Sequence, residues 1–197
     1  MNELHQLDYD FNGSPQRITL HWTGGSYTPS SLDAEHYQFL IDAEGTVFEG
    51  KYSVADQDST ASNYAAHTSQ FNTKNIGIAL CGMAGSHEGG DFGKYPITMA
   101  QWDAAINLCA FLCEGYDIDP DEQHLASHCE IERIHGVKQS GKWDVSCLSF
   151  STLTWKDLND SFRRDVNDAI YGVEPKESKL VTVIVPKGIK VEIVVQK

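Results

Sequence analysis

The stretch Asn75-Ile-Gly-Ile-Ala-Leu-Cys81 is nearly all apolar. A strand that is buried on both faces of its sheet shows such a continuous apolar run, whereas a half-buried strand alternates apolar and polar residues. We therefore expect residues 75–81 to form a central strand of the fold.

Three further strands are predicted on the N-terminal side of this run. Residues 17–22 alternate in polarity, which predicts a half-buried strand. The side chains expected on its apolar face are Ile18, Leu20 and Trp22. Residues 37–42 and 46–49 are strand-like runs joined at Ala43-Glu44-Gly45, and this arrangement predicts a hairpin.

The clearest helix is predicted over residues 97–114. Thr98 and Gln101 have the spacing of a capping box at its start. Apolar residues recur at helical spacing along one face, and these residues are Trp102, Ala105, Cys109, Leu112 and Cys113. Gly115 is expected to end the helix.

Two other helices are expected. Residues 30–36 form a short one, with Ser30 and Asp33 in capping-box spacing. Residues 154–171 form a second amphipathic helix. The residues expected to face inward are Trp155, Leu158, Phe162, Val166 and Ile170. Strands mixed with helices in this way predict an α/β or α+β domain.

A change in charge separates the C-terminal tail from the rest of the chain. The formal charge of the protein is −13, yet the tail from residue 174 carries five Lys and three Glu. Gly172-Val173-Glu174-Pro175 is typical of a helix stop followed by a linker. We therefore expect one domain over residues 1–172, and a linker and β-hairpin over 173–197. The strands of this hairpin are expected at residues 180–185 and 189–195.

Composition excludes several classes of function. The chain has 197 residues, of which 41% are hydrophobic, and no apolar run approaches the length of a membrane span. Its net negative charge argues against binding nucleic acid or anionic membranes. Residues 1–13 have no basic segment followed by an apolar one, so we expect no signal peptide and synthesis in the cytoplasm. The five cysteines show no disulfide spacing, which favours a reducing compartment.

Several histidines are candidates for chemistry. His21 ends a predicted strand on its polar face, directly before Thr-Gly-Gly. His124 and His128 are four residues apart, as in zinc hydrolases that place two histidines on one helix face. The intervening Leu-Ala-Ser lacks the Glu of that motif, and the segment fits a strand equally well.

The irregular stretch over residues 136–147 contains further reactive groups. Lys142, Asp144 and Cys147 lie within six residues. The alternative to a functional role is that Lys142 and Asp144 form an exposed ion pair. Hydrolysis of an amide needs an activated water and a sink for the oxyanion charge, which Zn²⁺ on three protein ligands supplies. No Cys-x2-Cys pair is present, so a structural zinc ribbon is not expected.

The order of these motifs resembles a known family. The motifs are His21-Trp-Thr-Gly-Gly, Tyr37-Gln-Phe-Leu-Ile-Asp-Ala-Glu-Gly-Thr-Val, His67 before Asn75-Ile-Gly-Ile, and Ser127-His128 before Lys142-Trp-Asp144. Over residues 15–165 the chain resembles zinc-dependent N-acetylmuramoyl-L-alanine amidases of the type-2 amidase and peptidoglycan-recognition-protein superfamily, especially phage or prophage endolysins. The resemblance implies an α/β fold in which helices flank a central mixed sheet and a zinc cleft runs along one face.

The resemblance also implies roles for individual residues. His21 and His128 would be zinc ligands. The third ligand would be Asp144, which fits the Lys-x-Asp form of the motif, or alternatively Cys147, which fits the Cys-x-x-Phe form. We favour Asp144, because Lys142 then lies two residues before the ligand.

Three other positions match functional residues of the family. Tyr37 and Lys142 match catalytic residues that stabilise the oxyanion. His67 matches a histidine of the cleft wall that contacts substrate. Ala79 is a departure, because many relatives that act on anhydro-muropeptides carry a Glu at this position of the central strand. No general base is expected there.

The implied activity is hydrolysis of the bond between N-acetylmuramic acid and L-alanine in peptidoglycan or a muropeptide. A cytoplasmically made endolysin would reach the wall after release through a holin. Two alternatives are a non-catalytic peptidoglycan-binding module and a cytosolic amidase that recycles muropeptides. No oligomeric state is predicted.

Overall fold

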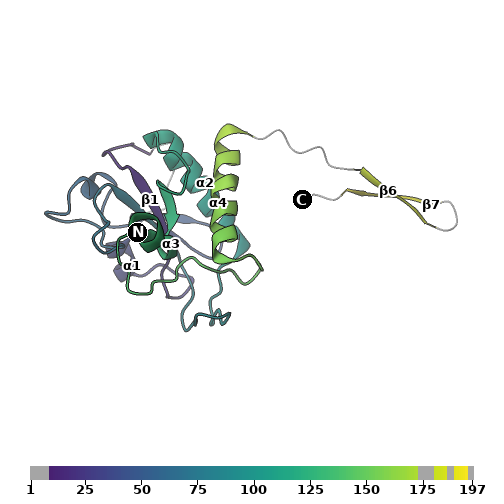
Figure 1. Ribbon diagram of the computed structural model, residues 1–197, viewed down its shortest axis with the longest axis horizontal. Coiled ribbons are helices and arrows are strands. Elements are labelled where there is room, and N and C mark those ends of the chain that lie inside the picture. Colours follow the sequence, from purple (N-terminus) through teal and green to yellow (C-terminus); the bar gives the residue numbers. More distant parts are fainter. Residues whose placement is uncertain (1–8, 173–179, 186–188, 195–197) are drawn as a thin grey trace.

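A five-stranded mixed sheet forms the centre of the fold, with strand order β3-β2-β4-β1-β5. The computed structural model describes residues 9–172, 180–185 and 189–194 (Figure 1). The strands are β1 (Arg17–Trp22), β2 (Phe39–Ile41), β3 (Val47–Glu49), β4 (Asn75–Leu80) and β5 (Leu125–Ser127). All neighbours are parallel except β2 and β3, which form the predicted antiparallel hairpin. The expected α/β class with a mixed sheet is confirmed.

The apolar run at residues 75–80 is the central strand, as predicted. β4 lies between β2 and β1, and each of its residues is fully buried. Ile76, Ile78 and Leu80 point into the main core, while Ala79 belongs to a smaller cluster on the opposite face. One strand therefore contributes to apolar packing on both faces of the sheet.

The prediction that residues 17–22 form a half-buried strand is wrong in one respect. β1 has the predicted bounds, but its residues from Ile18 to Trp22 are all buried. The strand pairs with β4 on one side and β5 on the other. Its polar residues are buried among other polar groups, since Thr19 bonds to Asn75 and His21 contacts Asp144. The alternating polarity of β1 therefore reflects one buried apolar face and one buried polar face.

Helices cover both faces of the sheet. They are α1 (Ser31–His36), α2 (Met99–Tyr116), α3 (His128–His135) and α4 (Trp155–Tyr171), with a short 3-10 turn, η2 (Ala55–Asp58). α2 and α4 pack side by side against the main core (Figure 1). On the other face, α1 buries Ala34 against Leu40, Ala79 and Cys81.

The predicted helix starts are confirmed, but one predicted stop is wrong. Ser30 with Asp33 and Thr98 with Gln101 form the expected capping boxes. α2 continues past Gly115 to Tyr116, and Asp117 ends it in the left-handed conformation at φ 56°. Gly115 is needed for packing, because a Cβ there would lie 1.9 Å from the ring of Phe11.

Two further features of the helices differ from the predictions. Trp155 was expected to face inward, yet it is 40% exposed and lies beneath the guanidinium of Arg133 on α3. It is the first residue of α4, and the buried residues of this helix begin at Leu158. α3 itself was not predicted. The short segment at residues 124–128 divides into β5 and the start of this helix.

The C-terminal strands pair with each other. β6 (Leu180–Val185) and β7 (Ile189–Val194) form a two-stranded antiparallel sheet. Residues 173–179 of the predicted linker lie outside the described residues, as do residues 1–8 of the N-terminal segment. Among the described helices, none combines the length and the apolar character needed to cross a membrane.

Candidate metal centre

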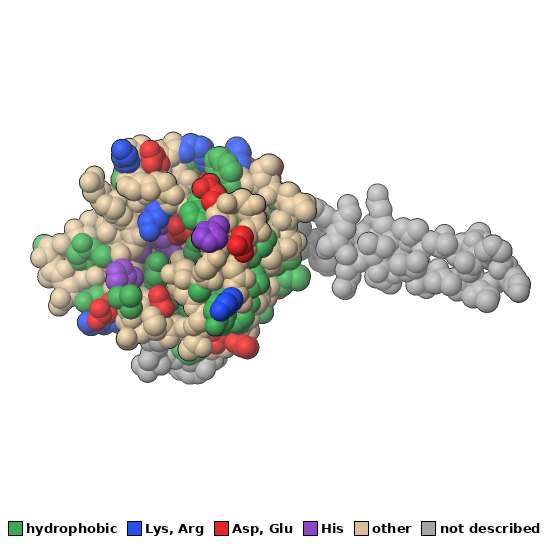
Figure 2. Space-filling model, turned by 90° about the horizontal axis from the view of Figure 1, so that it is seen from below, with side chains coloured by type: hydrophobic (Ala, Val, Ile, Leu, Met, Phe, Trp, Pro, Cys, Tyr) green, Lys and Arg blue, Asp and Glu red, His purple; other side chains and the backbone are tan. Residues whose placement is uncertain are grey.

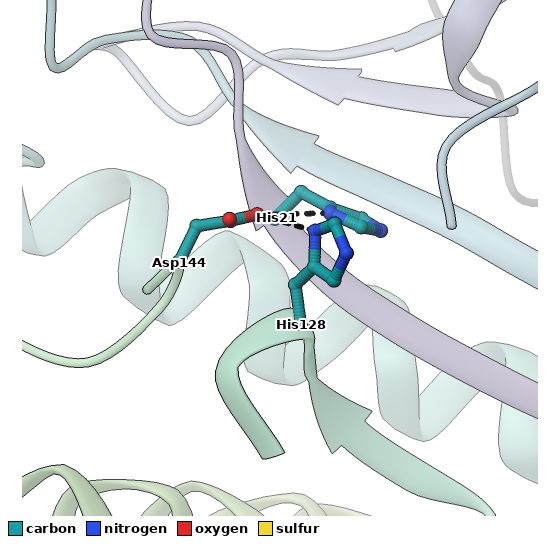
Figure 3. A group of neighbouring side chains, drawn as sticks. All are labelled: His21, His128 and Asp144. Atoms are coloured by element: carbon teal, nitrogen blue, oxygen red, sulfur yellow. Dashed lines mark hydrogen bonds and ion pairs between the residues drawn. The ribbon is translucent and has the colours of Figure 1, made fainter. Parts of the chain in front are cut away.

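Three polar side chains from distant parts of the chain meet at one edge of the sheet. His21 lies near the end of β1, and His128 directly follows β5 as the first residue of α3. Because β1 and β5 are parallel neighbours, their carboxyl ends meet at the same edge. Asp144, from the loop between α3 and α4, points toward both histidines (Figure 3).

The three side chains converge through one nitrogen of each ring and one carboxylate oxygen. Asp144 Oδ2 lies 2.9 Å from His21 Nδ1 and 3.2 Å from His128 Nδ1. The three candidate ligand atoms all lie within 4.8 Å of one another. His21 is fully buried, and His128 and Asp144 are 4% and 7% exposed. The structure thus brings together the residues predicted as the favoured ligand set.

The Asp144 loop is fixed on both sides. The Asp144 carbonyl accepts a 2.6 Å hydrogen bond from the backbone N–H of Cys129, next to His128. Asn159 of α4 donates its amide to the carbonyl of Val145 at 3.0 Å and also bonds to Ser127. One side chain therefore joins the segments that carry His128 and Asp144. Nothing in the sequence pattern singled out Asn159.

The outer nitrogen of His128 faces a hydrogen-bond acceptor. His128 Nε2 lies 3.0 Å from Gln139 Oε1. The amide nitrogen of Gln139 donates to the carbonyls of Ser69 and Val137 at 3.0 and 3.3 Å. Those contacts orient the amide so that its oxygen faces the imidazole. An amide oxygen only accepts, so this contact is a hydrogen bond when His128 carries a proton on Nε2.

The outer nitrogen of His21 also faces acceptors. His67 Nε2 lies 3.0 Å from the carbonyl of Asn75 and therefore carries the proton of that ring. His67 Nδ1, which then has a free lone pair, lies 3.2 Å from His21 Nε2. Thr68 Oγ1 is near both nitrogens and can accept from one while donating to the other. A proton on His21 Nε2 is therefore accepted by these groups.

These contacts allow both inner nitrogens to bind a cation. A neutral imidazole has one N–H, so a proton held on the outer nitrogen leaves a lone pair on the inner one. Burial lowers the pKa of His21 from 6.5 to about 4, against the opposing effect of Asp144, so its ring is neutral at pH 7. Without a cation, Asp144 is the alternative partner of both inner nitrogens, and their hydrogen bonds and charge outweigh burial and hold the pKa of its carboxyl well below its usual range.

The centre therefore fits a metal cation. With the protons on the outer nitrogens, two nitrogen lone pairs and an ionised carboxylate oxygen face one another, and a cation between them satisfies all three. Two imidazoles with one carboxylate form the three-ligand set of catalytic zinc sites, which keep a further position open. Outer hydrogen bonds that fix the ring tautomer are typical of histidines that bind metals.

Tyr37 and Lys142 lie at the border of this centre. The Tyr37 ring is centred 5.2 Å from the ring of His21. Burial, followed by the charge of Asp144, raises the pKa of Tyr37, so its hydroxyl keeps its proton and can donate. Lys142 is exposed on the loop two residues before Asp144. After burial and His128, its charge also contributes to lowering the pKa of His21.

His67 and Cys147 occupy less direct positions. His67 is 8% exposed, and its ring packs over Gly77, where a Cβ would lie 2.7 Å from the ring. Both of its nitrogens are used within the protein, and the predicted contact with substrate stays a prediction. Cys147 packs against the main core and is not part of the three-residue group. Burial raises the pKa of its thiol.

Charge on the surface is mixed. On the face of the described residues that Figure 2 shows, Lys and Arg side chains are interspersed with Asp and Glu, and they form no continuous basic patch there.

Comparison with known proteins gives one family match. Residues 11–145 match the family described as N-acetylmuramoyl-L-alanine amidase. No curated protein matches the chain.

Several solved structures are similar to the chain at low identity. The Ph2119 endolysin from Thermus scotoductus MAT2119 bacteriophage Ph2119 has 18% identity and a TM-score of 0.45, over 78% of this chain and 89% of that one. Drosophila PGRP-LB has 21% identity and a TM-score of 0.40, over 67% and 88%. The endolysin amidase LysCS from Clostridium intestinale URNW has 19% identity and a TM-score of 0.43, over 66% and 77%.

Proposed function

Since the chain belongs to the N-acetylmuramoyl-L-alanine amidase family, we propose that it is a zinc hydrolase that cuts the bond between N-acetylmuramic acid and L-alanine in peptidoglycan. The observation that carries this proposal is the buried meeting point of His21 Nδ1, His128 Nδ1 and Asp144 Oδ2. Acceptors beside the outer ring nitrogens support this proposal, because they allow the inner nitrogens to offer lone pairs to a metal.

His21, His128 and Asp144 would hold the zinc ion. When bound there, Zn²⁺ lowers the pKa of water and polarises a carbonyl group. The protein excludes bulk water from this position, since all three side chains are nearly or fully buried. Charges and dipoles act more strongly in such a site than in water.

Lys142 and Tyr37 would stabilise the oxyanion that forms when the amide is attacked. Lys142 offers a positive charge on the loop that carries Asp144. Tyr37 offers a hydroxyl that stays protonated, so it acts as a hydrogen-bond donor and not as a base. The position beside His21 on β4 is Ala79, which supplies no carboxylate for proton transfer.

The proposal is tested by metal analysis of the purified protein together with release of peptides from sacculi. We expect about one zinc per chain, and peptide release that stops with a chelator and returns with zinc. His128→Ala is the matched variant, because it removes one ligand. Zinc-independent release, or release that survives in His128→Ala, would overturn the metal mechanism.

The same assay separates the two alternatives. A binding module would associate with sacculi without releasing peptides. An amidase that recycles muropeptides would cleave soluble muropeptides but not intact sacculi. Cleavage of intact sacculi is the result expected for an enzyme that acts on the cell wall.

A further inference from the structure

Gln139 occupies a buried position behind His128 and makes contacts in two directions. It is 5% exposed, in the loop between α3 and Asp144. Its Oε1 accepts from His128 Nε2 at 3.0 Å. Its Nε2 donates to the carbonyl of Ser69, on a distant loop, at 3.0 Å.

We propose that Gln139 is a positioning residue that keeps the proton of His128 on Nε2, so that Nδ1 is ready for metal before any metal binds. The inference rests on the proposed zinc site, because Nδ1 of His128 is one of its ligand atoms. Gln139 is not one of the proposed ligands, and it is not among the site residues predicted from the sequence.

The reason lies in a competition for one proton. A neutral His128 has a single N–H, and an acceptor lies at each end of its ring. On the inner side Asp144 Oδ2 is 3.2 Å from Nδ1, and an ionised carboxylate is a stronger acceptor than an amide. If the proton moved to Nδ1, it would occupy the metal position. Gln139 offers the shorter contact on the outer side and opposes this move.

His21 shows the same arrangement with different residues. Its outer nitrogen faces His67, whose orientation is set by the carbonyl of Asn75. The two ligand histidines thus have different outer partners, which are linked through the bond of Gln139 to Ser69, next to Thr68. A variant that keeps a donor for Ser69, such as Gln139→Lys, is expected to affect His128 and to leave His21 unchanged, which gives the experiment an internal control.

A purely structural role for Gln139 makes a different prediction. In that case its amide N–H bond to Ser69 would matter, because it ties two loops together. Gln139→Lys keeps a donor for the Ser69 carbonyl but offers His128 no acceptor. Gln139→Glu keeps an acceptor for His128 but loses the donor. Gln139→Met loses both without adding charge.

The first measurement is the histidine tautomer in metal-free protein, from ¹⁵N NMR at about pH 8.5, where imidazoles with an ordinary pKa of about 6.5 are neutral. Wild type and Gln139→Glu should show His128 with its proton on Nε2. Gln139→Met and Gln139→Lys should show a loss of this tautomer at His128, and Gln139→Lys should show no change at His21. Retention of the Nε2 proton in Gln139→Met would overturn the proposal.

The second measurement is zinc affinity by competition with a chelator. Loss of such outer partners typically weakens metal binding about 10–100-fold, and this is the loss expected for Gln139→Met and Gln139→Lys. Gln139→Glu should bind zinc at least as well as Gln139→Met does. Lys138→Gln, at an exposed neighbour, makes the same change of one unit in net charge as Gln139→Glu and measures the effect of charge alone.

The outcomes separate the two proposals. High affinity in Gln139→Lys with low affinity in Gln139→Glu would assign Gln139 a structural role and refute the inference. A wild-type protein that binds no zinc would refute the proposed function. The tautomer measurement would still stand on its own, because it uses metal-free protein.

Discussion

Replacement of Asp144 should remove the stabilisation that zinc gives to the fold. Asp144 Oδ2 contacts both inner histidine nitrogens, and the only group of candidate ligands that includes these histidines among the described residues is completed by Asp144. Among the described residues, no other carboxylate or thiol groups with these two histidines. The perturbation is Asp144→Ala, and Cys147→Ser is the matched control for the alternative ligand.

The expected rise in Tm with zinc follows from mass action and from the number of residues that unfold. Free zinc at 100 times its Kd stabilises the folded state by about 2.7 kcal/mol. Unfolding of about 160 residues near 60 °C has an entropy of about 2.1 cal/mol/K per residue, so wild-type Tm should rise by about 8 °C. If Asp144→Ala weakens binding 100-fold, about 0.4 kcal/mol remains, or about 1 °C.

The assay is thermal unfolding of each protein with chelator and with zinc at one fixed free concentration. Cys147→Ser should keep the full rise in Tm, because Cys147 packs on the core and stands outside the ligand group. The reasoning is refuted if Cys147→Ser loses the rise while Asp144→Ala retains it. The proposed role of Lys142 in stabilising the oxyanion would then be refuted as well, since it depends on Asp144 being the ligand.

Three further predictions concern the chemistry, the scaffold and the tail. Lys142→Ala and Tyr37→Phe should keep the zinc-dependent rise in Tm but lose about 10²–10³ in turnover, and wild-type rates in both would contradict their assignment. Arg163→Met leaves the fully buried Glu130 without its bidentate partner, so denaturant unfolding should show a loss of about 3–5 kcal/mol; a loss below 1 kcal/mol would contradict this. Truncation after Gly172 should leave zinc binding and hydrolysis of small muropeptides intact, and loss of folding would place the tail in the core.

The elements that the sequence predicted are those with a strong local pattern. The apolar run at residues 75–80 and the stripe of α2 follow from periodicity alone. α3 has only eight residues, too few for periodicity alone to predict a helix. Glu130 accepts from the backbone N–H of Ser127 at the start of α3 and also pairs with Arg163, 33 residues away on α4. Such a contact exists only once the domain has folded.

Some features of the candidate site could be predicted from the sequence, and others depend on tertiary contacts. His21, His128 and Asp144 could be proposed because they occur in an ordered set of motifs. The proton positions on His21 and His128 could not be predicted, since they are set by His67 and Gln139 across tertiary contacts. Gln139 lies in an irregular loop without any spacing rule, and only its hydrogen bonds identify it.

The central strand explains why the site lies on one particular face of the sheet. Ile76, Ile78 and Leu80 fill the core beneath the long helices. The alternate positions include Gly77 and Ala79, whose small side chains leave room on the other face. The ring of His67 packs against Gly77, and His21 pairs with Ala79 in the sheet. A larger residue at position 77 would displace His67 and remove the outer partner of His21. The continuous apolar run of β4 therefore serves both functions, because its large residues build the core and its small ones make space for the metal ligands.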